Sequence, residues 1–302
     1  MAASQCGADT ASFASVEFAF GHAATSGAQG WIYVAEQHAR ALSPALLWAS
    51  KHNVVALNIF SEVDADVLAR RAQLFNFDVT IWQVNAGKVT RATAAQSLPT
   101  INVADSHERF ALMIETSGAE LVREHGQLTG EVLGLEVCRV VNDDSGEGGR
   151  LEIGVGAHDR ETFQLVYGRE ATIESLARVV GIVREHRMEG SVPHPLNRLA
   201  QARLLRHRII SSPELVDAQQ LRSVEPPVIR MNVKDELPCA AAGTLADGSP
   251  VVVVCTASID IDVVSFGADA RLRTAPDAAL IIATYANNVT PSLHKLAQSL
   301  RN

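Results

Sequence analysis

The ionisable side chains with the greatest potential for chemistry occur between residues 131 and 161, next to several glycines. Glu136 lies in the apolar stretch EVLGLEVCRVV, and Glu152 lies in a second apolar stretch that begins at Leu151. A carboxylate that faces a core is costly unless it is paired, so each glutamate is expected to face solvent, an arginine or a binding site. Ordinary alternation in a strand with one wet face is the simpler explanation for either glutamate alone.

The second apolar stretch leads into GVGAHDRE, where ionisable residues follow two glycines. These residues are His158, Asp159, Arg160 and Glu161. Glycines let a backbone bend or approach a ligand closely, which is typical of a site. A helix N-terminus is an equal interpretation, with Asp159 as the N-cap and Glu161 in the first turn. The two interpretations are compatible.

A locally basic segment, SVPHPLNRLAQARLLRHRII, supplies a second group of polar residues. It contains His194, Asn197, Arg198 and Arg203. We interpret it as a solvated helix face that begins near His194. Its acidic flanks and its lack of aromatic residues argue against a nucleic-acid-binding patch.

These residues support a first hypothesis, a small-molecule enzyme that acts on a nucleoside-like or otherwise polar, anionic ligand. α/β proteins usually bind ligands at strand ends, where these side chains stand beside glycines. His158 or His194 would be the acid–base group, and the arginines would clamp an anion such as phosphate. The candidate catalytic residues are Glu136, Glu152, His158, Asp159 and His194, and the candidate binding residues are Arg160, Asn197, Arg198 and Arg203.

A second hypothesis is a non-catalytic structural or partner-binding protein. In it the same side chains form a buried ion-pair network, with pairs such as Glu136–Arg198 or Asp159–Arg203. The sequence leaves this hypothesis and the enzyme open to the same degree.

A third hypothesis is a degenerate metal-dependent nuclease of the PD-(D/E)XK type. Glu124, Glu136 and Glu152 have the order that such a site needs, on a helix and then on two strands, to hold a divalent cation. Gly154 stands where the nuclease would have its lysine. The run IDIDVV would add two acids on one face of a strand, without a lysine to complete the site.

Several large classes of enzyme are excluded because their motifs are missing. The sequence contains no P-loop, GxGxxG fingerprint, GxSxG elbow or HExxH motif. The four cysteines are widely scattered and form no CxxC pair, so no metal site is predicted. No cofactor and no oligomeric state is indicated.

The elements that would position these residues follow from periodicity and capping. Residues 54–60 predict a strand, 64–75 a helix and 79–84 a strand, which together have the size of a parallel βαβ unit. Residues 171–187 place their apolar side chains on one face and predict the most convincing helix. Further helices are predicted at 31–53, 108–126 and 290–300, and further strands at 131–141, 151–155, 250–255, 259–264 and 279–284.

Composition indicates a globular protein without a membrane span. The chain has 302 residues, of which 47% are hydrophobic, and a net charge of −8 that opposes nonspecific binding to nucleic acid. The longest clean apolar run, at residues 251–255, is far shorter than the roughly 20 residues that cross a bilayer. The N-terminus has no secretory signal, and the scattered cysteines fit a reducing compartment, so we predict a cytoplasmic protein.

We therefore predict an α/β fold with a mixed β-sheet flanked by helices on both faces, in a three-layer α/β/α-like arrangement. Residues 1–30 would be a flexible N-terminal segment. Residues 31–302 would form a single domain, within which 31–95 could be a semi-independent lobe.

The chain also resembles a family of conserved, uncharacterised actinobacterial proteins. The resemblance covers most of residues 45–300 and is carried by LARRAQLF, GEVLGLEVCRVV, LEIGVGAHDRE, HPLNRLAQARLLR and VVVVCTASIDIDVVSFGADARL. It implies an α/β fold with a loose likeness to purine nucleoside phosphorylases. The family has no established activity to transfer, and no phosphorylase signature can be placed on this sequence.

Overall fold

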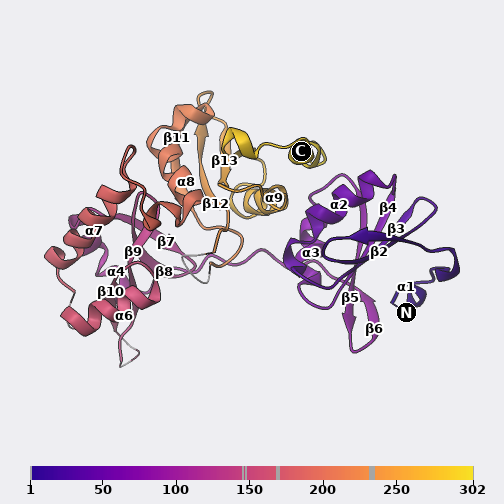
Figure 1. The fold of residues 1–302 in the computed structure, drawn as a ribbon, viewed down its shortest axis with the longest axis horizontal. Helices are drawn as coiled ribbons and strands as arrows, with labels where there is room; N and C mark the ends of the chain where they lie inside the picture. Colours follow the sequence, from indigo (N-terminus) through magenta and orange to yellow (C-terminus); the bar gives the residue numbers. More distant parts are fainter. Residues whose placement is uncertain (1, 145, 147, 168–170, 231–234, 302) are drawn as a thin grey trace. The chain divides into compact units, whose positions relative to one another are not determined.

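A computed structural model describes residues 2–301 apart from 145, 147, 168–170 and 231–234, and its contacts divide the chain into two compact units. Unit 1 contains Met1–Ser97, Ile259–Leu272 and Val289–Asn302, and unit 2 contains Leu98–Ser258 and Arg273–Asn288. Helices and mixed sheets confirm the α/β class (Figure 1). The division differs from the single domain over 31–302 that the sequence predicts.

Unit 1 is built on one six-stranded sheet with the order β1-β2-β3-β4-β5-β6. β3, β4 and β5 are parallel neighbours, and the other neighbouring pairs are antiparallel. The strands are β1 Ala14–Phe18, β2 Gly21–Ser26, β3 Gln29–Val34, β4 Ala56–Ser61, β5 Asp78–Asn85 and β6 Lys88–Arg91. The helices of unit 1 are α1 Ala2–Gln5, α2 Leu42–Lys51, α3 Ala65–Ala72, α9 Val263–Thr274, which ends in unit 2, and α10 Pro291–Gln298, with 3-10 helices η1 Thr10–Ser12 and η2 His38–Arg40.

The N-terminal part of unit 1 corrects two predictions. Residues 1–30 are not a flexible segment throughout, because β1 and β2 pair from Ala14 and Thr25 onwards and extend the sheet beyond β3. Residues 31–53 are not one helix, because the aromatic and β-branched run at Trp31 forms β3, as its strand propensity favours. The helix is limited to α2.

α2 and α3 cover one face of the unit 1 sheet. A Cβ added at Gly30 would meet the Trp48 ring of α2, so the alternate residues of β3, including Ile32, face this side. Trp31 and Tyr33 therefore face the opposite side. That side is covered by α1 and by the segment that carries Phe13.

Unit 2 contains two four-stranded sheets, with the orders β10-β9-β8-β7 and β11-β12-β13-β14. All neighbouring pairs are antiparallel except β13 and β14, which are parallel. The strands are β7 Glu120–Glu124, β8 Gln127–Val132, β9 Leu135–Asn142, β10 Gly149–Ile153, β11 Ala218–Val224, β12 Cys239–Leu245, β13 Pro250–Cys255 and β14 Ala279–Ala283. The helices are α4 Asp105–Glu108, α5 Ala111–Thr116, α6 Gly156–Tyr167, α7 Ile173–Arg187 and α8 Gln201–Ser211, with η3 Pro195–Arg198, η4 Pro213–Val216 and η5 Ala286–Asn288.

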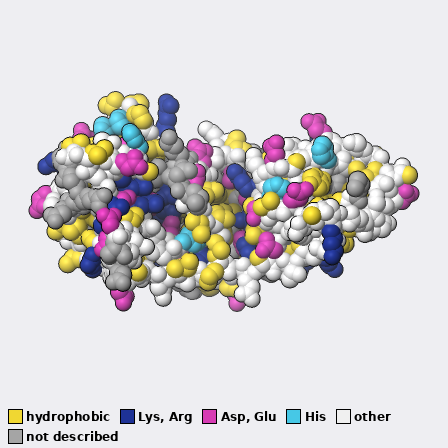
Figure 2. Space-filling view, turned by 90° about the horizontal axis from the view of Figure 1, so that it is seen from below, with side chains coloured by type: hydrophobic (Ala, Val, Ile, Leu, Met, Phe, Trp, Pro, Cys, Tyr) yellow, Lys and Arg dark blue, Asp and Glu magenta, His cyan; other side chains and the backbone are white. Residues whose placement is uncertain are grey.

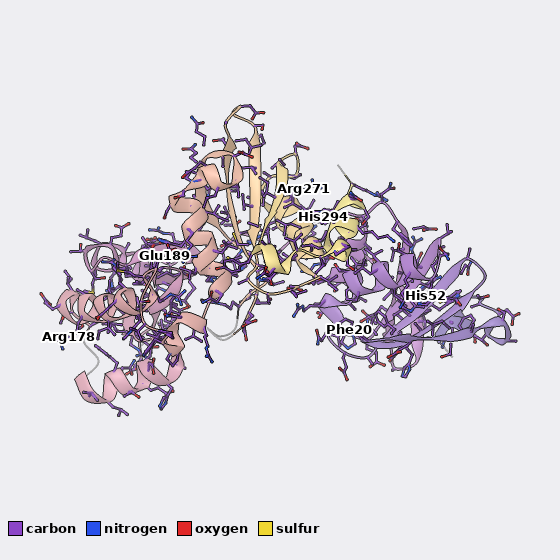
Figure 3. The ribbon with its side chains drawn as sticks, turned by 45° about the horizontal axis from the view of Figure 1, so that its top comes forward. Phe20, His52, Arg178, Glu189, Arg271 and His294 are labelled. Atoms are coloured by element: carbon purple, nitrogen blue, oxygen red, sulfur yellow. The ribbon has the colours of Figure 1, made fainter. Side chains whose placement is uncertain are left out.

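α7 forms as its sequence predicts. Thr172 caps the helix and exchanges hydrogen bonds with Ser175 in a capping box, which satisfies N–H groups of the first turn. Leu176 and Val180 are buried in the core of unit 2, while Arg178 lies on the exposed side of the helix (Figure 3). The helix thus closes over the β7–β10 sheet with one apolar face.

Three other predicted elements of the chain are wrong. The helix predicted at 108–126 is replaced by α4, α5 and strand β7. The strand predicted at 131–141 is a hairpin, in which Leu133 and Gly134 have positive φ and turn β8 into β9. The acidic run at 259–264 is not a strand but the turn that leads into α9. Among the described residues, no helix is both long and apolar enough to cross a membrane.

Candidate functional site

A buried carboxylate, Glu136 of β9, is surrounded by arginines. Arg139 donates two hydrogen bonds to it, at 2.7 and 3.0 Å. Arg160 of α6 lies 3.4 Å away, and Arg230 donates from a loop at 3.1 Å. The side chain of Glu136 is only 1% exposed, so its charge is held by these three guanidinium groups.

Glu152 of β10 extends this cluster, because it stands directly across from Arg139 in the strand pairing. It lies 2.8 Å from Arg150 and 3.3 Å from the Nε of Arg160. Four arginines thus face two glutamates, which leaves an excess of positive charge. Dark-blue and magenta side chains lie together in a recess at the left of the molecule (Figure 2), the part that contains β7–β10 in Figure 1.

Burial lowers the pKa of two of these arginines, whereas the hydrogen bonds to Glu136 raise the pKa of Arg139. Burial and the charge of Arg139 lower the pKa of Arg160, although Glu136 opposes this effect. Burial and the charge of Arg203 likewise lower the pKa of Arg230. A further negative charge at this place would therefore stabilise the protonated guanidinium groups.

A second cluster nearby in the same unit is balanced. Arg203 and Arg206 of α8 each contact both Glu124 of β7 and Glu131 of β8, with Arg206 at 2.9 Å from Glu124 and 3.2 Å from Glu131. Burial alone would raise the pKa of Glu124, but the two arginines outweigh it and hold this pKa at about 2. The pKa of Arg203 is raised, since Glu131 and Glu124 outweigh its burial. This cluster needs no ligand.

A small cavity of about 80 Å³ lies at the N-terminus of α8. Arg203 and Arg230 both line it, so it touches both clusters. Its volume corresponds to two or three water molecules, at roughly 30 Å³ each. The remaining lining residues are Ala200, Gln201, Ala202, Asp235, Glu236, Leu237, Thr256, Ala257 and Ser258.

Of the candidate catalytic residues, Glu136 and Glu152 come together, and the candidate binding residue Arg160 joins them. His158 and Asp159 are exposed on α6, and Asp159 lies in the first turn of the helix rather than at its N-cap. A residue directly before Arg160 points elsewhere on the helix, because successive positions are about 100° apart.

The candidates from the basic segment are dispersed. His194 caps η3 and stacks on His186, with ring centroids 4.0 Å apart. Asn197 and Arg198 form part of η3, and Arg198 is exposed. Arg203 is buried in the balanced cluster, so the predicted solvated helix face is wrong at this residue. The predicted pairs Glu136–Arg198 and Asp159–Arg203 are not the pairs that the described residues form, since both arginines take other positions.

The geometry does not suit the nuclease. Glu124 lies on a strand, not on the predicted helix. Glu124, Glu136 and Glu152 all face guanidinium groups, which occupy the positions that a divalent cation would need. No group of three or more possible metal ligands is present among the residues that the structure describes.

Sequence reasoning missed a third charged cluster, in unit 1. Asp269 of α9 accepts hydrogen bonds from Arg70 and Arg71 of α3, at 2.8 and 3.1 Å. Asp262 lies 3.5 Å from Arg71, and Asp260 lies 2.7 Å from Arg40. The signal was present in LARRAQLF and in the acidic run at 259–264, but nothing in the sequence pairs two segments so far apart.

The pKa of Asp262 is the most perturbed in this third cluster. Burial raises it to about 7, and the carboxylates of Asp260 and Asp269 add to the effect against Arg71 and Arg40. Its Oδ1 accepts no hydrogen bond from a described residue. The cluster holds separate segments of unit 1 together.

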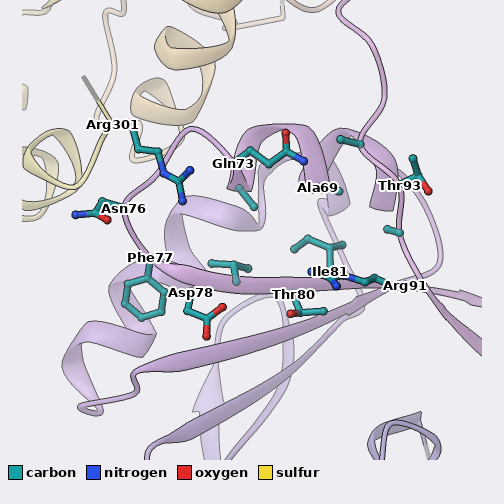
Figure 4. Close-up of a pocket in the computed structure, with 14 residues that line it drawn as sticks. Ala69, Gln73, Asn76, Phe77, Asp78, Thr80, Ile81, Arg91, Thr93 and Arg301 are labelled. Carbon is teal, nitrogen blue, oxygen red and sulfur yellow. The ribbon is translucent and has the colours of Figure 1, made fainter.

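A cavity of about 670 Å³ lies in unit 1 between α3 and β5 (Figure 4). Gln73 and Asn76 line its α3 side, Asp78 and Thr80 its β5 side, and Arg301 one end. None of the residues predicted for chemistry lines it. The described lining contains no acid–base pair in hydrogen-bond contact.

No family model, no curated protein and no solved structure matches this chain. The resemblance to uncharacterised actinobacterial proteins stays an expectation.

Proposed function

We propose that unit 2 binds a small ligand through an anionic group, a phosphate or a carboxylate, in the cavity at the N-terminus of α8. The observation that carries this proposal is one small cavity that is lined by the first residues of α8, by Arg230 and by Ser258. The first backbone N–H groups of α8, the guanidinium of Arg230 and the hydroxyl of Ser258 can each donate a hydrogen bond to an anion.

The N-terminus of α8 supports the proposal because it is uncapped. Ala200 stands at the N-cap position, with φ 49°, and no side chain caps the helix. The first N–H groups of a helix have no intrahelical acceptor, and the helix dipole adds positive potential there. The first turn carries no acidic residue to supply the missing charge. An anion in the cavity would satisfy these groups.

Arg230 and the Ser258 hydroxyl supply the remaining donors, because the Thr256 hydroxyl already donates to the carbonyl oxygen of Ser258 at 3.5 Å. Arg230 belongs to the cluster with excess positive charge, and it reaches the cavity as well as Glu136. Thr256 and Ser258 follow β13, at the carboxyl end of a strand that has a parallel neighbour. Ligands of α/β sheets bind at such ends.

Acidic residues at the same cavity limit the ligand further. Asp235 and Glu236 line it together with the donors. A ligand that is only an anion would be repelled by the carboxylate of Glu236. A ligand that also carries a hydroxyl or amino group would donate to this carboxylate, which favours a small polar compound such as a hydroxy acid over a bare anion.

The proposal is a binding role in the cytoplasm, and it assigns no acid–base catalyst. His158 is exposed on α6 and His194 stacks on His186, so neither histidine belongs to the described lining of the cavity. A structural role is the second candidate. It is favoured for Arg203 and Arg206, whose charges are balanced by Glu124 and Glu131.

Calorimetric titration tests the anion site. The full chain would be titrated with inorganic phosphate, adenosine 5′-monophosphate and citrate at constant ionic strength. We expect Arg230→Ala to weaken binding by about 10- to 100-fold, because a hydrogen bond to a charged group contributes about 1.5–3 kcal/mol. Glu136 keeps Arg139 and Arg160 in this variant, so the fold should persist.

The matched control is Arg198→Ala. Arg198 is exposed and does not line the cavity, so its loss changes the net charge equally without removing a donor. An equal loss of affinity in the two variants would mean that Arg230 attracts the anion only through its net charge and does not contact it. Absence of binding for all three probes would refute the proposal.

A further inference from the structure

The sheet of unit 1 carries a row of aromatic side chains on the face away from α2 and α3. Strand register places His22, Tyr33, Phe60 and Trp82 directly beside one another on β2, β3, β4 and β5. Trp31 lies two residues before Tyr33 and therefore on the same face. Four neighbouring strands thus present one continuous aromatic surface.

The rings of this surface are close to parallel. The centroids of Trp31 and Phe60 are 6.2 Å apart with an interplanar angle of 18°, and those of Phe60 and Trp82 are 6.2 Å apart at 13°. Phe13 adds a fourth ring at 5.5 Å from Trp31. The rings therefore stack along the row, and a flat aromatic ligand could extend this row by offset or edge-to-face contact.

A cavity of about 510 Å³ lies over part of this surface. Its volume is within the range of small-molecule sites, roughly 300–1,000 Å³. Its described lining contains no Asp, Glu, Lys or Arg, so it offers no counter-charge to an ionic ligand. The lining residues are Ala2, Ala3, Phe13, Ser15, His22, Ala23, Ala24, Trp31, Ile32, Tyr33 and Phe60.

Trp31 leaves one hydrogen-bond donor of this lining unused. Its side chain is buried, with 8% of the residue exposed, and its Nε1–H has no acceptor among the described residues. Trp82 on the same face differs, because its Nε1 donates to Asn58 Oδ1 at 2.9 Å. A buried donor without an acceptor is costly and uncommon, so an acceptor from a ligand would stabilise the site.

The cover over this face is short. α1 has four residues, and Gln5 holds it through two hydrogen bonds to the β5–β6 hairpin, with Gly87 at 2.7 Å and Val89 at 3.2 Å. α1 and the segment that carries Phe13 together cover this face, so a ligand that reaches the Nε1 of Trp31 would displace part of this cover.

We propose that this face of unit 1 binds a neutral, flat heteroaromatic ring that accepts a hydrogen bond from Trp31 Nε1. The aromatic floor selects a flat ring, the uncharged lining selects a neutral one, and the unused donor selects a ring with an acceptor atom. The site consists of unit 1 residues alone and does not depend on the anion site of unit 2.

A pair of probes with the same shape tests the donor directly. Quinoline carries a ring nitrogen that accepts a hydrogen bond and is neutral at pH 8, whereas naphthalene has the same outline without an acceptor. The dissociation constants of both would be measured on the full chain by ligand-observed NMR titration, in the native protein and in Trp31→Phe. We expect Trp31→Phe to weaken quinoline about tenfold more than naphthalene, the ratio that one hydrogen bond of ordinary strength gives.

Trp82→Phe is the matched control, since it removes an indole from the same row whose donor is already used by Asn58. We expect it to leave the ratio of the two dissociation constants unchanged. Ala24→Phe, directly across from Trp31 in the strand pairing, would fill the cavity and is expected to abolish binding of both probes. Circular dichroism would confirm that each variant is folded.

Two outcomes would overturn this proposal. One is that neither probe binds the native protein below millimolar concentration. The other is that Trp31→Phe weakens the two probes equally, which would leave only an apolar surface without a role for the donor. Phosphate titration of the same samples reports on unit 2, so failure here is distinguishable from failure of the anion site.

Discussion

At the scale of single residues, Glu131 carries a larger share of stability than its sequence context suggests. Its carboxylate contacts both Arg203 and Arg206, and the residue is 2% exposed. Replacement by glutamine keeps the shape and removes the charge that two buried arginines need. We expect Glu131→Gln to lower the free energy of unfolding by about 3–5 kcal/mol, measured by urea denaturation.

Glu108→Gln provides the comparison for this prediction. Glu108 forms a bidentate pair with Arg123, but the side chain of Arg123 is 49% exposed. Exposed pairs contribute about 0–1 kcal/mol, so this variant should be close to the native protein. Equal effects of the two substitutions would mean that the buried cluster is no more important than a surface pair.

The sequence shows which charged residues are candidates for chemistry, but it does not show which residues they contact. Glu136, Glu152 and Arg160 come together because β9 and β10 pair and α6 follows directly, which are local relations that the sequence makes visible. Arg230 reaches Glu136 from 94 positions away, and such distant contacts leave no pattern in a single sequence. The prediction that His158 lines the site is wrong, because His158 is exposed on α6 whereas Arg160, two residues later on the same helix, is buried at the site.

At the scale of elements, the β8–β9 hairpin fixes the position of α8. Gly134 in its turn has φ 75°, and a Cβ there would lie 2.3 Å from the backbone carbonyl carbon of Arg203. A side chain at this position would push the helix away from Glu131. We expect Gly134→Ala to destabilise the protein by more than about 3 kcal/mol, measured by thermal and urea unfolding.

Gly248→Ala separates the clash from backbone strain. Gly248 also lies in a hairpin turn, with φ 85°, but no atom lies within 4 Å of an added Cβ. The left-handed conformation alone costs a non-glycine residue about 1–2 kcal/mol. If both substitutions cost the same, the approach of the hairpin to α8 does not matter for stability.

Helices and turns that are marked by residues close in the sequence, such as a capping threonine, could be predicted. Elements whose conformation depends on distant contacts could not. The helices predicted at 171–187 and 290–300 form as α7 and α10, which are capped by Thr172 and Thr290, because a cap depends only on residues close in the sequence. The turn at Leu133 was missed because it lacks the Asn-Gly or Asp-Gly pair that marks most two-residue hairpins. The acidic run at 259–264 alternates like a strand, yet the contacts of Asp260 and Asp262 with distant arginines place it in a turn.

At the scale of the whole molecule, unit 1 is assembled from three separate parts of the chain. Asp269 is almost fully buried against Arg70 and Arg71, which precede it by about 200 residues. The ion pairs therefore join segments whose order in the sequence gives no hint of their proximity. This is why the sequence predicts one domain although its contacts form two units.

The same cluster predicts a dependence of stability on pH. The pKa of Asp262 is raised to about 7 by burial, so the folded protein holds a proton there that the unfolded chain releases near pH 4. Stability from this group is present at low pH and is lost as the pH rises from about 4 through 7. We expect a loss on the order of a few kcal/mol, which urea denaturation at a series of pH values would measure.

Asp262→Asn isolates this group from other titrating residues. Asparagine resembles the protonated acid, so the variant should be closest to the native protein near pH 4 and should exceed its stability near pH 8. The difference between the two proteins would then grow with pH. A constant difference from pH 5 to pH 8 would show that Asp262 does not titrate in this range.

Helix α9 has a consequence for any shortened form of this protein. Its residues up to Leu272 complete unit 1, whereas every strand of that unit lies before residue 92. A fragment that ends at Ser97 would contain the whole sheet yet leave two guanidinium groups without their buried carboxylate. Unit 1 is thus expected to complete its folding only after synthesis of the chain has passed Asp269, long after its strands have been made.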